Sequence, residues 1–472
     1  MDKATQLNAV LDRLSPQQAT ELARAAELNR ALGRQDMPST AILEGLRPML
    51  RATRPPRVPT LQRLICVGLE DFLSDRTDDP RLEGLVPRSS LAPWWQAAKL
   101  LAGGEIEALE ARLGEQLAAA APNLETLQHE AQEAAAGWST AIIAELAKPK
   151  PSLALRKLVP ELIARDIDMI AHMLTVVRPL GAAMKSLHRV AGRLGLLEGR
   201  RLTDLAPDCV TLLKQQYQAL SESHGMDARF LPLAALNRLL QPRQILRLGR
   251  ALSWKPNDSL VANTELFCVG ARLIGEVERL ARSVLQQMPR RGPLPSPAAL
   301  GMALMDYLDE SEGVLSEIGV RRDSPWGTAI LQTRSDVAHA LDSDFLDRFA
   351  ELVRALLPLA QRPAHGPDLS VEPSRETIAW AREAAGFLKL LCQRGQRHGF
   401  AKPAFETIDG LAADIEERIT GLCEAARVAP ESRAAIEAQA RAAAEICDEL
   451  FDDARSTTII RRVAAALRAT AA

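Results

Sequence analysis

Apolar residues near the C-terminus recur at alternating spacings of four and three positions. This spacing places apolar side chains on one face of an α-helix and is typical of helices that pack lengthwise against each other. Pro430 and Ser432 separate two such runs, so the pattern predicts an antiparallel helical hairpin whose many alanines bring the helix axes close. The first run is Ile408, Ala412, Ile415, Ile419, Leu422, Ala426 and Ala429, and the second is Ile436, Ala440, Ala443, Cys447, Leu450 and Ala454.

Local signals predict where many other helices begin. Ser15 can cap a helix that has Pro16 at its first position, and Asn123 can cap a long helix that runs to residue 146. The stretch DSPWGTAIL, residues 323–331, predicts a tight helix start anchored by Trp326. We also expect a helix start near Ser90, a Thr203 cap, and a long periodic helix over residues 257–288.

A helical stripe is also predicted within residues 153–197. Its apolar positions are Val176, Leu180, Leu187, Ala191 and Leu194. Pro160 and Pro179 are expected to break or kink this helix, because proline has no backbone N–H and collides with the preceding turn.

Composition agrees with a helical chain. Aromatic residues make up only 4% of the 472 residues, while Ala, Leu, Arg and Glu, which all favour helices, dominate. The sequence therefore predicts an all-α protein, built as a multi-segment helical bundle or an irregular helical array. Proline-rich stretches divide it into an N-terminal helical region (1–149), a basic central region (150–290), a helical segment (296–362) and a C-terminal hairpin region (373–472).

Charge is unevenly distributed although the formal net charge is only −2. Residues 151–255 carry 16 basic and 8 acidic side chains, a difference of +8. Within them, cations recur at helical spacing in two stripes, which predicts two basic helix faces. The first stripe is Arg178, Lys185, Arg189 and Arg193, followed by Arg200 and Arg201; the second is Arg243, Arg247 and Arg250.

Two interpretations of these stripes stay open. Arginine forks bind phosphates, so the nine residues could form a site for nucleic acid or an anionic membrane surface. Alternatively, the stripes are the solvated faces of amphipathic helices, or contacts between domains. Tyr217, Phe230 and Trp254 are the only aromatic residues of types Tyr, Phe and Trp in this region, so platforms for base stacking are few, and the second interpretation is favoured.

The segment STTIIRRVAAALRAT, residues 456–470, raises a similar question. An apolar stripe of Ile459, Ile460, Val463 and Leu467 lies beside three arginines. Such a helix could lie on a membrane or in a partner's groove, but we expect it to pack on its own domain.

The familiar motifs of catalysis and cofactor binding are absent. The sequence contains no phosphate-binding glycine loop, no GxSxG, no HExxH and no CxxC, so we expect no cofactor and no metal ion. Three helical clusters keep an unrecognised metal-dependent enzyme as an alternative. They are Asp168 and His172 with Asp166, Asp336 with His339, and Asp306 with Asp309 and Glu310.

The expected function is that of a non-catalytic helical scaffold or adaptor, which binds other macromolecules through helix faces and grooves. Its protein partners are unknown, and the C-terminal seam predicts a tendency to form a homo-oligomer. Six scattered cysteines, no signal peptide and no run of 18 apolar residues are typical of a cytoplasmic protein.

Overall fold

A computed structural model gives the fold of most of the chain. It describes residues 14–31, 42–43, 46, 59–75, 82, 84–118, 123–199, 201–252, 264, 266–289, 292–356, 369, 373–396, 398–428, 432–451 and 453–469. Helices dominate these residues, and the prediction of an all-α fold is confirmed.

The α-helices of the first half are α2 (Pro16–Ala31), α4 (Leu61–Val67), α5 (Leu91–Leu117), α6 (Leu124–Leu146), α7 (Leu153–Leu158), α8 (Glu161–Arg193), α9 (Pro207–His224), α10 (Phe230–Arg238) and α11 (Leu246–Leu252). Those of the second half are α13 (Phe267–Gln286), α14 (Pro297–Glu317), α15 (Pro325–Ala340), α16 (Ser343–Leu356), α17 (Arg375–Gly395), α18 (Ala401–Val428), α19 (Arg433–Leu450) and α20 (Asp453–Ala469). Short 3-10 turns are η1 (Glu70–Phe72), η2 (Arg88–Ser90), η3 (Gly225–Arg229) and η4 (Pro242–Ile245).

Strands play a minor part among the described residues. β1 (Leu73–Ser74) pairs in parallel with β2 (Val86–Pro87), with Leu73 opposite Val86. β3 (Leu197–Glu198) pairs antiparallel with β4 (Arg201–Leu202), with Leu197 opposite Leu202. Each strand has two residues, so neither pair forms a layer of the fold.

The chain divides into two compact units, and the first comprises residues 1–67 and 104–131. Ala19, Ala23 and Ala26 on one face of α2 pack against Ile42 and Leu46. The predicted start of α2 is confirmed, because the backbone N–H of Gln18 donates to the Ser15 hydroxyl and the N–H of Ser15 donates to the Gln18 side chain.

The second unit comprises residues 68–103 and 132–472. Its N-terminal core contains Trp94 and Trp95 of α5, both buried, and the indole N–H of Trp94 donates to Ser139 at 2.9 Å. The expected helix start near Ser90 is confirmed, since α5 begins at Leu91 after η2. The helix α8 packs against α9 and α10.

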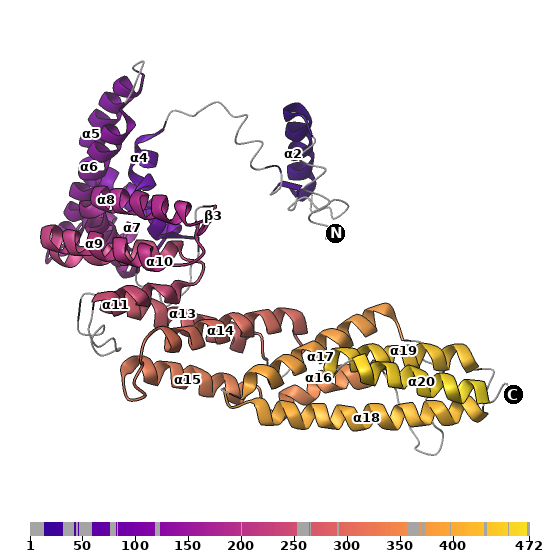
Figure 1. Ribbon diagram of the computed structural model, residues 1–472. Helices are drawn as coiled ribbons and strands as arrows, with labels where there is room; N and C mark the ends of the chain where they lie inside the picture. The colour runs from indigo at the N-terminus through magenta and orange to yellow at the C-terminus, as the bar shows by residue number, and fades with distance from the viewer. Residues whose placement is uncertain are drawn as a thin grey trace. The chain divides into compact units, whose positions relative to one another are not determined.

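Five helices, α16 to α20, form the C-terminal bundle (Figure 1). The predicted hairpin is confirmed: α18 and α19 contact each other, joined by a short link, and Arg418 of α18 donates to Gln439 of α19 at 2.6 Å. In the two apolar runs that predicted the hairpin, every position whose side chain is described is buried, except Ala412, which is partly buried. Ala429 and the side chain of Ala454 lie outside the described residues.

The C-terminal helix α20 packs on its own domain, as expected. It contacts both α18 and α19, and Ile459, Val463 and Leu467 are buried while Ile460 stays exposed. The predicted hairpin is therefore part of a three-helix arrangement (Figure 1).

One prediction about a helix end differs from the structure. The Thr203 cap is wrong, because α9 begins at Pro207, four residues further along the chain. Pro160 precedes α8 as expected. Pro179 lies inside α8 and does not end it, and the expectation of a kink at Pro179 stays a prediction.

The other helix starts agree with their predictions, as far as they are described. Asn123 accepts from the N–H of Thr126 before α6, and Ser324 accepts from that of Gly327 at the start of α15, where Trp326 is buried. The helix expected over 257–288 is described from Phe267 onward, as α13, and most of the preceding residues lie outside the description. The four-segment division stays a prediction.

Candidate functional site

The first basic stripe lies on the exposed face of α8. Arg178, Lys185, Arg189 and Arg193 are all exposed, and we call these four residues the α8 basic face. The spacing of four and seven residues aligns them along the helix. The opposite face is buried in the core, and its residues in this stretch are Val176, Val177, Leu180, Ala183, Met184, Leu187 and Ala191.

The cations of this face have few partners within the protein. Arg178, Arg189 and Arg193 make no hydrogen bond or ion pair in the described part of the chain, whereas Lys185 does have a polar interaction. Arg201 of β4 is exposed, and Arg200 lies outside the described residues. The α8 basic face is therefore positive charge open to solvent.

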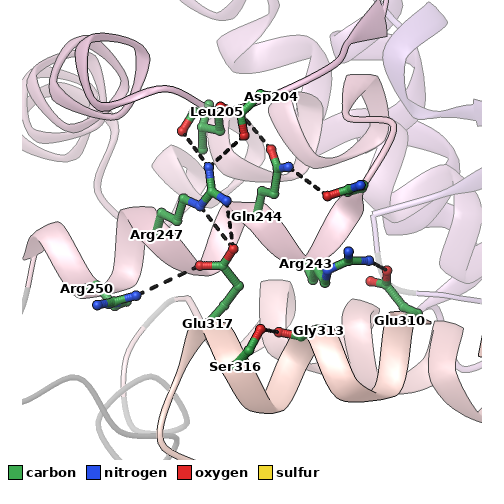
Figure 2. A network of polar contacts seen from close by, with 11 residues as sticks. Asp204, Leu205, Arg243, Gln244, Arg247, Arg250, Glu310, Gly313, Ser316 and Glu317 are labelled. Atoms are coloured by element: carbon green, nitrogen blue, oxygen red, sulfur yellow. Dashed lines mark hydrogen bonds and ion pairs between the residues drawn. The ribbon is translucent and has the colours of Figure 1, made fainter. Parts of the chain in front are cut away.

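Two members of the second basic stripe, Arg243 and Arg247, are partly buried and paired with carboxylates of α14, as Figure 2 shows, whereas Arg250 is exposed. Arg247 of α11 donates from Nη1 to Asp204 at 2.8 Å and to the Leu205 carbonyl at 3.0 Å. Its Nε and Nη2 reach Glu317 of α14 at 3.0 and 2.9 Å, and this hydrogen bonding raises the pKa of Arg247. Arg250 lies 3.9 Å from the same carboxylate.

Arg243 is the most enclosed member of the second stripe. Its Nη1 lies 3.1 Å from Oε2 of Glu310, a residue of α14 that is only 6% exposed. The Arg243 side chain passes over Gly313, where a Cβ would stand 1.8 Å from its Cδ. Burial raises the pKa of Glu310, and the neighbouring Arg243 opposes that shift.

The two stripes therefore differ in what they can bind. A polyanion approaching Arg243 or Arg247 would have to displace Glu310, Glu317 or Asp204 (Figure 2). A polyanion approaching Arg178, Arg189 or Arg193 would displace no carboxylate of the described residues. The sequence alone could not make this distinction, because Glu317 is 70 residues from Arg247 along the chain.

The acidic clusters do not converge into a metal site among the described residues. Glu310 points into the protein toward Arg243, whereas Asp306 and Asp309 are exposed on another face of α14. Buried Asp166 accepts from the Ser90 hydroxyl, while His172 lies 3.3 Å from Asp227. Asp336 accepts from Gln332 at 2.8 Å.

One buried polar cluster was not predicted from the sequence. His398, in the turn after α17, lies with Nε2 2.7 Å from Oε1 of Glu312 on α14, and Arg394 reaches Glu312 and Asp309. Burial lowers the pKa of His398, with the Glu312 hydrogen bond opposing it. A lone histidine 86 residues from its carboxylate partner carries no local signal.

The helix α8 also meets the length and hydropathy criteria for a membrane span. It is the one helix among the described residues that is long and apolar enough to cross a bilayer, and 56% of its most apolar stretch is buried inside the protein. A core helix passes the same test, so this is weak evidence for a membrane span.

Comparisons with protein-family models, with curated proteins and with solved structures find no match for this chain.

Proposed function

We propose that this protein is a helical scaffold or adaptor, and that it binds an anionic macromolecule along the α8 basic face. The observation that supports the proposal is the contrast between the two stripes. Arg243 and Arg247 are matched by carboxylates of the protein itself, whereas Arg178, Arg189 and Arg193 have no such partner in the described chain.

Electrostatics within α8 supports the same proposal. Lys185, Arg189 and Arg193 stand one turn apart, and like charges at this spacing destabilise a helix by about a few tenths of a kcal/mol per pair. No Asp or Glu lies between Asp168 and Glu198 to offset them along the sequence. A bound anion would remove this repulsion, so the free energy of α8 itself favours occupation of the face.

The competing explanation is that the face is only solvated. Arg193 lies in the last turn of α8, where a cation interacts favourably with the helix dipole without any ligand. The test must therefore separate these cations from exposed cations elsewhere on the protein.

Heparin is a suitable general probe, because it is a flexible polyanion without bases or a bilayer. The triple variant Arg178→Ala, Arg189→Ala and Arg193→Ala should weaken binding of labelled heparin by at least about tenfold in fluorescence anisotropy. The matched control removes three exposed cations from other helices, Lys157, Arg427 and Arg461, and should change the affinity by less than about twofold.

Equal losses in the two triple variants would mean that heparin responds to net charge alone, and would contradict a site on α8. Thermal unfolding of both variants should match that of the parent protein, because none of the substituted side chains is buried.

A further inference from the structure

We infer that the anionic partner of the α8 basic face is the sugar–phosphate backbone of a nucleic-acid duplex, bound without reading its bases. This inference rests on the proposed function and specifies its ligand. Three features of the face support a duplex: its length, its low profile between the cations, and the side chains it lacks.

The length of the face suits a stiff polyanion. Arg178 and Arg193 are fifteen residues apart, about 22 Å along the helix axis at 1.5 Å per residue. A duplex carries a phosphate about every 1.7 Å along its axis, so such a span meets many phosphates at once. Arg178, Arg189 and Arg193, distributed along it, can each reach a different phosphate.

Between the cations, the exposed surface of α8 carries only small side chains. The exposed positions among them are Gly181, Ala182 and Gly192, whose side chains are small or absent. A Cβ at Gly181 would meet no atom within 4 Å. The backbone of a rod-shaped partner can therefore approach α8 closely while the long Arg and Lys side chains reach around it.

The same positions lack what other anionic partners need. Hot spots of protein interfaces are enriched in Trp, Tyr and Arg, and positions 178 to 193 carry no Trp or Tyr that could anchor a protein partner beside the arginines. Membrane-surface helices insert several apolar side chains, but the large apolar residues Leu180, Met184 and Leu187 of this stretch face the protein core. Leu194, which directly follows Arg193, was expected in the apolar stripe but is 43% exposed. Single strands stack on aromatic rings; α8 has no Phe, Tyr or Trp, and its His188 is only partly exposed.

Arginine and lysine side chains on an open helix face contact phosphates without entering a groove to read base edges. Binding should therefore be independent of sequence and strongly dependent on salt. With two to four phosphates neutralised, the logarithm of the affinity should fall against the logarithm of salt concentration with a slope of about −2 to −4.

The experiment measures binding of the full-length protein to labelled duplexes of about two helical turns by fluorescence anisotropy, between about 50 and 200 mM KCl. Two unrelated DNA sequences and one RNA duplex distinguish B-form from A-form backbones. Both DNA duplexes should bind within about twofold of each other, and a single strand of the same length should bind more weakly.

The variants locate the contact. The triple variant at Arg178, Arg189 and Arg193 to Ala should bring the salt slope to between about −1 and 0, because the three arginines without partners in the described chain are removed. The same three positions changed to Lys should keep most of the slope, because the positive charges are retained. A slope unchanged by the alanine variant would overturn the inference.

Vesicles and polyglutamate, together with heparin, distinguish a failure of this inference from a failure of the proposed function. Anionic phospholipid vesicles and polyglutamate should bind more weakly than the duplexes. If either binds while the duplexes do not, the partner class is wrong although the α8 basic face still binds anions. If heparin binding is also insensitive to the alanine variant, the proposed function fails together with this inference.

Discussion

At the scale of single residues, Gly313 shows how one missing side chain sets the position of a charge. The Arg243 side chain fills the space that a Cβ at residue 313 would occupy, with Nε 2.0 Å from the ideal Cβ position. Any larger residue there moves Arg243 away from Glu310, which is buried and has one oxygen without a hydrogen-bond partner in the described residues. The pair therefore depends on the glycine.

Gly313→Ala is expected to lower the free energy of unfolding by about 1–3 kcal/mol, the range for leaving a buried polar group unpaired. Gly301→Ala is the matched control in the same helix, because its Cβ would make ordinary contacts at 3.7 Å with Leu390 and Phe387. The control should gain up to about 1 kcal/mol from helix propensity. Urea denaturation measures both, and equal stability of the two variants would contradict the role of Gly313.

His398 is a second residue whose surroundings decide its behaviour. Its side chain is 1% exposed, and Nδ1 has no hydrogen-bond partner in the described protein. The charged side chains of Glu312 on α14, Arg334 on α15 and Arg394 on α17 face it. Burial and the two arginines lower the pKa of His398 more than Glu312 raises it, so the ring is held neutral.

Stability should therefore fall in mild acid. The pKa of His398 is lower in the folded than in the unfolded chain, so the unfolded state binds the proton at higher pH. The neutral His398 ring therefore contributes to the free energy of unfolding above about pH 6.5. This contribution is lost as the pH falls from there toward the pKa of the folded state, by up to about 1.4 kcal/mol per pH unit.

His398→Gln is the comparison, since glutamine can still donate to Glu312 but does not titrate. Urea midpoints from about pH 8 to 5 should fall more steeply for the parent protein than for this variant. Parallel pH profiles would show that His398 does not carry the acid sensitivity.

At the scale of helices, α19 illustrates how alanine allows close packing. Ala440, Ala443 and Ala444 are all at most 5% exposed, and α19 contacts α17, α18 and α20. Three neighbours bury most of the circumference of this helix, and four of its buried positions are alanines, namely Ala440, Ala442, Ala443 and Ala444. The seam predicted one contact face, and the structure adds two more.

Ala443→Leu should destabilise the C-terminal bundle by about 1–3 kcal/mol, because the site has no space for a larger side chain. Ala434→Leu, at an exposed position of the same helix, should change stability by less than about 0.5 kcal/mol. Thermal unfolding followed by circular dichroism compares the two. Similar melting temperatures would mean that α19 is packed less tightly than its burial indicates.

Helix starts were predictable where the signal was local. The side chains of Ser15 and Asn123 accept from backbone N–H groups three residues ahead. Such a cap involves only neighbouring positions, so it can be predicted from the local sequence. Thr203 is a residue of the same type, but α9 begins at Pro207, whose fixed φ suits the first helical position, and Ala206 is the cap residue. A cap signal fails where a second start signal lies a few residues further along the chain.

At the scale of the whole molecule, a net charge of −2 coexists with a strongly basic surface on one helix. The central arginines differ in their neighbours. Arg243 of η4 and Arg247 of α11 pair with carboxylates of α14, whereas the arginines of the α8 basic face are exposed to solvent. Anion binding would therefore depend on the local charge of α8 and not on the net charge of the protein. The salt dependence of binding tests this local charge, whereas the isoelectric point reports only the net charge.

The sequence by itself determined the helical class, the C-terminal hairpin, several helix starts and the alignment of cations along α8. These follow from residue periodicity and from contacts within three or four positions, which the chain encodes locally. Only the tertiary structure decided that Arg243 and Arg247 meet Glu310 and Glu317, that His398 meets Glu312, and that α20 completes the hairpin. Such pairs are set by how helices pack, and charge patterns along a chain do not specify which distant carboxylate an arginine will reach.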